Sequence, residues 1–203
     1  MAARSIVIGI AGAALGLAAA VALLPQVRER LSPSVGQQVS GKALVGGAFT
    51  LTDSSGKRVT DQDYRGKYTL VFFGFTSCPD ICPAGLQLIA GALEKLGPKA
   101  QRITPIFISV DPERDTPEKL AAYVKNFDPR LVGLTGTPEE IAAVAKAYKV
   151  YYAKVPNKER AGDYTMDHTS IIYVMDPKGE FVTHFTPSTS VDELASRLDK
   201  LLS

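Results

Sequence analysis

The sequence predicts a single α/β domain built around a mixed β-sheet. Two continuous apolar runs, Leu70–Phe75 and Ile103–Val110, have the pattern of strands that are buried on both faces. Segments with helical periodicity separate these runs and follow them, and the chain closes with two strand patterns and an amphipathic segment. The resulting order, β-α-β-α-β-α followed by β-β-α, is typical of an α/β fold with a mixed central sheet and flanking helices.

The first elements form a hairpin that leads into the first buried strand. Phe49–Thr52 and Arg58–Thr60 flank a turn that contains Gly56. Asp61–Gly66 is predicted to be a short helical turn. After the strand, Pro83 is expected to begin a helix, because proline is tolerated at a helix start. The apolar positions of this helix are Leu86, Ile89, Leu93 and Leu96.

The rest of the chain repeats strands and helices joined by polar turns. Asp111–Pro117 is a polar loop after the second buried strand, and Thr137 is placed to cap a helix. Alternation in Val150–Val155 before a charged turn predicts a second hairpin. The remaining expected elements are a helix from Thr116 to about Phe127, short strands at Leu131–Leu134, Ser170–Met175 and Phe181–Phe185, and a final helix at Val191–Leu202.

Composition limits the classes of function. The chain has 203 residues, is 45% hydrophobic and 22% charged, and carries a formal net charge of +2. Near-neutral charge without a basic block argues against a nucleic-acid partner. Two cysteines in a chain of this length do not form a disulfide framework, so they are expected to be a reactive or metal-binding pair.

The N-terminal residues 6–24 carry no charge and match the length of a membrane span. We interpret them as a single-pass anchor that leaves Arg4 in the cytoplasm, and a cleaved signal peptide is the alternative. The anchor is favoured because a signal-peptide apolar core is usually shorter. The predicted division is an anchor at 1–25, a linker at 26–44 and a domain at 45–203. Either interpretation exports the domain. Because the preceding segment is too short and too poor in arginine for an organelle transit peptide, we expect a bacterial protein. The favoured anchor places it in the inner membrane with its domain in the periplasm.

The two cysteines, Cys78 and Cys82, lie between the end of a core strand and the start of a helix. Four-residue spacing on a helical turn places both sulfurs on one face, where they can close a disulfide or bind one metal ion. A helix N-terminus should favour their thiolates. Two thiolates suit a soft ion, above all Cu(I). The residues alone leave a metal site and a redox pair as equal alternatives, ahead of an inert structural disulfide.

A third ligand is sought among the two histidines of the chain. His168 is expected in a loop before a core strand, from which it can reach the cysteines. His184 is expected inside a strand, with its side chain on the opposite face. The aspartates Asp80, Asp111 and Asp115 are interpreted as turn and cap residues rather than ligands.

Four sequence blocks resemble the Sco/SenC family of copper-binding cytochrome c oxidase assembly proteins. The blocks, in the family's order between residues 45 and 202, are FFGFTSCPDICP, ISVDPERDTP, LTGTPEEI and DHTSIIYVMDPKGEF. The resemblance implies a thioredoxin-like fold with an inserted hairpin, preceded by an N-terminal transmembrane helix. It also implies that Cys78, Cys82 and His168 bind copper, as Cu(I) and also as Cu(II).

The function implied by the resemblance is that of a metallochaperone, not an enzyme. It would deliver copper to the dinuclear site of cytochrome c oxidase subunit II, with a copper-donor chaperone and a thioredoxin-like reductant as further partners. The alternative is a thiol-disulfide oxidoreductase with a redox-active disulfide at Cys78 and Cys82. Its dithiol form would reduce the oxidase cysteines and would itself become the Cys78–Cys82 disulfide. Against a general thioredoxin, three residues separate the cysteines, and His168-Thr169 stands where thioredoxins resemble one another in carrying a cis-proline. A peroxiredoxin and a copper-binding redox sensor are the other rivals.

Overall fold

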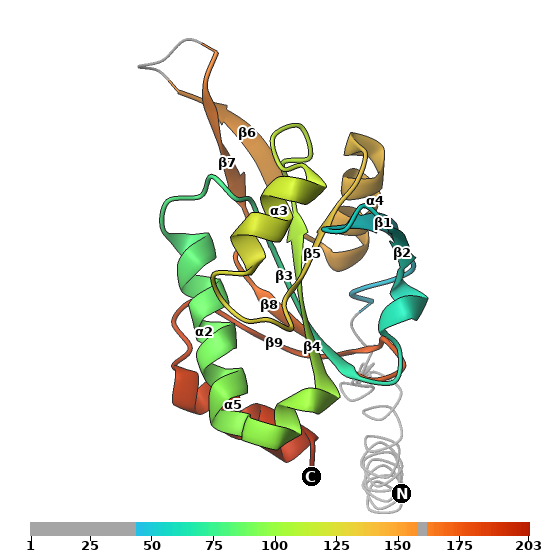
Figure 1. Ribbon diagram of the computed structural model, residues 1–203, viewed down its shortest axis with the longest axis vertical. Helices are drawn as coiled ribbons and strands as arrows, with labels where there is room; N and C mark the ends of the chain where they lie inside the picture. Colours follow the sequence, from blue (N-terminus) through green and yellow to red (C-terminus); the bar gives the residue numbers. More distant parts are fainter. Residues whose placement is uncertain (1–43, 158–161) are drawn as a thin grey trace, which may run out of the picture. The chain divides into compact units, whose positions relative to one another are not determined.

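The computed structural model describes residues 44–157 and 162–203. Its helices and strands follow the predicted order (Figure 1). They are β1 (Thr50–Asp53), β2 (Arg58–Thr60), the 3-10 turn η1 (Asp61–Tyr64), β3 (Tyr68–Gly74), α2 (Ile81–Leu96), the 3-10 turn η2 (Gly97–Arg102), β4 (Ile103–Ser109), α3 (Pro117–Val124), β5 (Val132–Thr135), α4 (Pro138–Tyr148), β6 (Tyr152–Pro156), β7 (Tyr164–His168), β8 (Ile172–Met175), β9 (Phe181–Phe185) and α5 (Val191–Leu201).

The main sheet has seven strands in the order β2-β1-β5-β4-β3-β8-β9. Strands β3, β4 and β5 run parallel, whereas β1 and β8 pair antiparallel with β5 and β3. Strands β6 and β7 form a separate two-stranded sheet. Figure 1 shows this hairpin projecting beyond one end of the main sheet. The predictions of a mixed sheet and of an additional hairpin are therefore confirmed.

Aromatic side chains from the two central strands fill the core on both faces of the sheet. On one face, the ring of Phe72 packs against that of Phe107, and Tyr123 of α3 covers Phe107. On the other face, Phe73 contacts Tyr148 of α4 at a ring-centroid distance of 5.4 Å. Successive residues on a strand point to opposite faces, which is why a strand covered by helices on both sides reads as a continuous apolar run.

Three of the helices begin at a side chain that accepts a backbone hydrogen bond. Thr116, Thr137 and Ser190 each precede their helix and accept from the N–H three residues on. These bonds satisfy donors that have no partner within the helix. Helix α3 ends at Val124 rather than at the predicted Phe127. Asn126 accounts for the difference, because its side-chain amide donates to carbonyls of the last turn and closes the helix there.

Within residues 44–157 and 162–203, no helix has both the length and the apolar character needed to cross a membrane. The predicted anchor at 6–24 and nearly all of the predicted linker lie outside the described residues. The described part of the chain belongs to one compact unit.

Candidate metal centre

The cysteine segment leaves the carboxyl end of β3, in the middle of the sheet. Strand β3 pairs in parallel with β4 over its whole length, so the loops after both strands emerge at the same edge. The chain turns at Thr76 and Ser77, and the N–H of Cys78 donates to the carbonyl of Phe75 at 3.2 Å. The fold therefore places the first cysteine at the end of a rigid core strand.

The second cysteine belongs to the first turn of α2. The helix begins at Ile81, two residues before the predicted start at Pro83. Proline is tolerated there because the first N–H groups of a helix have no partner within it. The N–H of Cys82 donates to the sulfur of Cys78 at 3.3 Å, which keeps both sulfurs on one side of the turn.

Gly74 lets the Cys82 sulfur approach the strand. A β-carbon at this position would lie 2.7 Å from Cys82 Sγ and 2.7 Å from a ring carbon of Phe107. Only glycine leaves room for both groups. As a result Cys82 is fully buried, whereas Cys78 is partly exposed.

His168 is the last residue of β7, so the prediction that it lies in a loop is wrong. Its Nε2 lies 3.4 Å from Cys82 Sγ, and its Nδ1 lies 3.1 Å from the carbonyl oxygen of Thr169. A carbonyl only accepts, so Nδ1 carries the proton and Nε2 presents its lone pair to the sulfur. The imidazole also packs against the ring of Phe75 in a T-shaped arrangement. The hairpin thus brings His168 to the cysteines with its ligand atom facing them.

Burial controls the protonation of this site. It lowers the pKa of the His168 imidazole, which keeps the ring neutral and able to bind a metal. Burial also raises the pKa of the Cys82 thiol, and the neighbouring Cys78 adds to the rise. The expectation that the helix N-terminus favours the thiolate is therefore wrong for Cys82, because loss of hydration outweighs the helix dipole.

The three donor atoms form one cluster. Cys78 Sγ, Cys82 Sγ and a ring nitrogen of His168 all lie within 4.8 Å of one another. Three ligands arranged around one ion, each bonded at about 2.0–2.3 Å, lie about 3.7–4.0 Å from one another. No pair of donors therefore needs to change its separation by more than about 1 Å to share an ion. Two sulfurs with one imidazole suit a soft or borderline metal.

The other candidates stand apart from this cluster. His184 in β9 is exposed and stacks on Phe181. Asp80 precedes α2 without making a side-chain capping bond. Asp111 and Asp115 are not ligands, but both are fully buried, which the interpretation as turn residues did not anticipate. Their position after β4, the parallel neighbour of the cysteine strand, is the signal that could have placed them beside the site.

The fold and the donor cluster define a thioredoxin-like protein with a Cys-x3-Cys and histidine cluster that could hold a metal ion. The SCO1/SenC family model matches residues 37–203, and the chain belongs to this family.

Known relatives agree with this assignment. Protein SCO1 homolog, mitochondrial, from Homo sapiens is 47% identical over 164 residues, which are 80% of this chain and 54% of that protein. The chain thus spans about half the length of this curated relative. The structure of Bradyrhizobium japonicum ScoI with copper bound is 51% identical, with a TM-score of 0.72 over 77% of this chain and 98% of that one. BsSco, a member of the Sco family of cytochrome c oxidase assembly proteins with a disulfide switch, is 26% identical, with a TM-score of 0.63 over 82% and 99%.

Proposed function

We propose that this chain is a copper chaperone that binds copper through Cys78, Cys82 and His168. The observation that carries the proposal is the convergence of two sulfurs and one imidazole nitrogen within 4.8 Å. Membership of the SCO1/SenC family and the copper bound in the Bradyrhizobium japonicum relative support it. Thiolate and imidazole donors match Cu(I), and Cu(II) is the second state that this donor set accommodates.

The two cysteines have unequal access to a partner. Cys82 is sealed by the core, whereas Cys78 and His168 line a groove of about 210 Å³ that also contains Ile81 and Met166. Incoming ligands of an acceptor therefore reach the ion from the groove, and exchange can proceed one ligand at a time. A three-coordinate ion leaves room for such an incoming ligand, so copper can be held and still released.

The protonation states of the free site set the conditions for loading. His168 binds in its neutral form, which burial favours. The buried Cys82 thiol must lose its proton to the solvent when it binds, because the thiolate is the ligand. Both cysteines are free thiols in the structure, and a disulfide between them would remove both thiolates. Loading therefore requires the reduced pair.

The proposed acceptor is the dinuclear copper site of cytochrome c oxidase subunit II. A copper-donor chaperone would load the site, and a thioredoxin-like reductant would keep its cysteines reduced. We propose that residues 1–25 anchor the chain in the bacterial inner membrane, 26–44 form a linker and 45–203 form the periplasmic copper-binding domain. Assignment of BsSco to a family of oxidase assembly proteins supports this role.

Copper binding by single variants of the full-length chain tests the metal site. Cys78→Ala and Cys82→Ala should lose Cu(I) in competition with a colorimetric chelator, and His168→Ala should lose affinity and change the Cu(II) absorption spectrum. His184→Ala is the matched control, since it removes the other histidine of the chain from an exposed position. Wild-type affinity and spectra in His168→Ala would show that the third-ligand assignment is wrong.

The role in oxidase assembly is tested in cells. Deletion of the gene should lower cytochrome c oxidase activity, and added copper should restore it. The rival thiol-disulfide oxidoreductase predicts a different result, namely repeated reduction of insulin disulfides by the copper-free protein. Robust turnover in that assay, together with an oxidase defect that copper does not rescue, would refute the chaperone function and support the reductase function.

A further inference from the structure

A polar loop with two buried carboxylates contacts both halves of the proposed metal centre. The loop Asp111–Asp115 follows β4 and precedes α3, at the same edge of the sheet as the cysteine turn. Its first and last residues are both fully buried carboxylates, although neither is a metal ligand. Buried charges are costly unless they are paired or hydrogen-bonded, so the contacts of these two groups show what the loop holds.

Asp115 holds the cysteine turn. Its two carboxylate oxygens accept from the backbone N–H of Thr76 at 2.9 Å and from the Thr76 hydroxyl at 2.6 Å. The hydroxyl of Ser109, at the end of β4, donates to the same carboxylate at 2.6 Å. Thr76 stands two residues before Cys78. The carboxylate thus links the end of β4 to the segment that presents the first sulfur.

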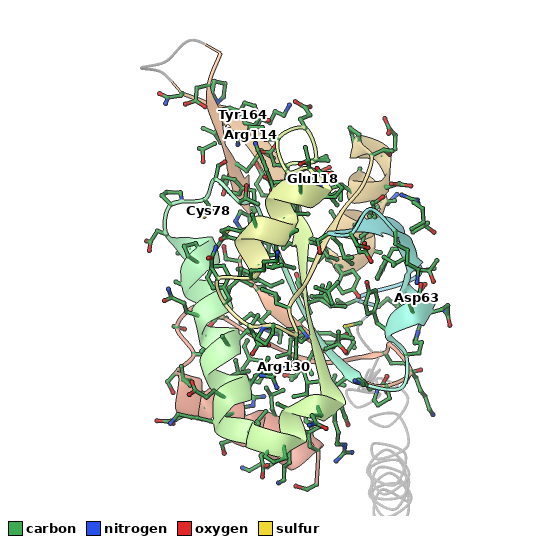
Figure 2. All side chains as sticks on the ribbon, viewed as in Figure 1. Asp63, Cys78, Arg114, Glu118, Arg130 and Tyr164 are labelled. Atoms are coloured by element: carbon green, nitrogen blue, oxygen red, sulfur yellow. The ribbon has the colours of Figure 1, made fainter. Side chains whose placement is uncertain are left out.

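Asp111 and Arg114 hold the histidine hairpin. Tyr164, the first residue of β7, donates its hydroxyl to Asp111 at 2.8 Å. Arg114 forms an ion pair with Asp111, donates to the Tyr164 carbonyl at 2.8 Å, and lies over the Tyr164 ring at 3.8 Å. Figure 2 shows Arg114 and Tyr164 side by side near the projecting hairpin, with Cys78 apart from them. A further loop residue, Glu113, pairs with Lys154 of β6 at 2.6 Å.

The hairpin needs such an anchor. Strands β6 and β7 pair with each other and, among the described residues, with no strand of the main sheet. An isolated two-stranded hairpin is only marginally stable in water. His168 ends the second of these strands, so its distance from the sulfurs depends on what fixes the hairpin to the domain.

We propose that Asp111 and Arg114 are positioning residues that set His168 against the cysteines, and that Asp115 positions the cysteine turn. The loop thus fixes both halves of the site, and we call Asp111, Arg114 and Asp115 together the bracket. This inference rests on the proposed copper binding. Outer groups that orient a ligand typically contribute about 10–100-fold to metal affinity. Asp111 and Arg114 act on the histidine, whereas Asp115 acts on the cysteine turn. The two effects can therefore be tested separately.

Double-mutant cycles for Cu(I) affinity separate the two arms of the bracket. Arg114→Ala should lower affinity about tenfold, and it should cause no further loss in a His168→Ala background, because its effect passes through the histidine. Asp115→Asn should lower affinity in both backgrounds, because it acts through the cysteine turn. Arg58→Ala is the matched control, since its ion pair with Glu140 links β2 to α4 away from the site. Additive losses for Arg114→Ala and His168→Ala would overturn the positioning role.

A second measurement uses the protein without copper. Arg114→Ala and the conservative variant Tyr164→Phe should speed amide hydrogen exchange in 164–168 and leave exchange in α2 unchanged. If Arg114→Ala does not fold, Arg114→Lys and Tyr164→Phe take its place in both experiments. Wild-type exchange in the hairpin would overturn the bracket, whatever the protein does with copper. Failure of wild-type protein to bind copper would instead refute the proposed function.

Discussion

Replacement of Gly74 by alanine should disable the metal centre through one methyl group. The new β-carbon would lie 2.7 Å from Cys82 Sγ, and ordinary contacts begin at 3.4 Å. The sulfur must therefore retreat by about 0.7 Å, or the strand must shift by as much. Metal-ligand distances tolerate only about 0.2 Å. A displacement of this size separates Cys82 from an ion held by the other two ligands.

The expected cost has two components. Overpacking of a filled core typically lowers the free energy of unfolding by about 1–3 kcal/mol. Displacement of a ligand should lower Cu(I) affinity at least about tenfold, the equivalent of ~1.4 kcal/mol. The first component is measured by urea unfolding of the copper-free protein, and the second by competition with a chelator.

Gly85→Ala is the matched control for this experiment. Its β-carbon would lie 2.7 Å from the ring of Phe72, so it overpacks the same core without touching a ligand. Alanine is also favoured over glycine in a helix by about 1 kcal/mol, which offsets part of the loss. Gly85→Ala should therefore lose some stability and keep its copper affinity. If Gly74→Ala also kept wild-type affinity, the position of the Cys82 sulfur would not govern binding.

Three further predictions concern other parts of the domain. Asp128→Asn should destabilise the protein by about 1–3 kcal/mol at pH 7, because Asp128 accepts three hydrogen bonds from Arg130 that lower its pKa. This contribution is present above the ordinary value of 3.8 and is lost as pH falls through the lowered pKa, so urea unfolding should give converging stabilities below about pH 4. Iodoacetamide at pH 8 should alkylate the partly exposed Cys78 well before Cys82, which is buried and has a raised pKa; equal rates by mass spectrometry would contradict the burial. Thr137→Ala should cost about 1 kcal/mol in thermal unfolding through loss of the α4 cap and leave copper affinity unchanged.

The main sheet was predictable because its signals are local. Strands β3 and β4 are continuous apolar runs, and the hairpin of β1 and β2 surrounds a turn that contains Gly56. Helix starts at Thr116 and Thr137 follow from a capping side chain and a proline, both readable from a few residues. The start of α2 was misplaced because the prediction followed Pro83 and not Asp80, which is the residue before the helix although its side chain makes no capping bond.

The proposed metal ligands were only partly predictable from the residues. Adjacent cysteines at a strand-helix junction identify a reactive pair, but their order of exposure depends on Gly74, which nothing in the local pattern singles out. His168 was one of two candidate histidines, and the family resemblance singled it out. The residues alone predicted the hairpin but not that its second strand extends to His168, which pairs with Tyr152 of β6.

The loop after β4 shows why residue type alone does not identify the polar residues next to a site. Its composition is that of an exposed turn, with Asp111, Arg114 and Asp115. A loop of the same composition at the other end of the sheet would be solvated. The two aspartates are buried here, and Arg114 is partly buried, because β3 and β4 are parallel and the loops after both strands emerge at one edge. The hairpin covers that edge. Sequence separation does not oppose this arrangement: Thr76 and Asp115 are 39 residues apart, and Asp111 and Tyr164 are 53 apart. A hairpin that is only marginally stable by itself needs further contacts to keep its ligand in place. Buried carboxylates that accept several hydrogen bonds supply such contacts, because opening of the hairpin would leave a buried charge without its donors.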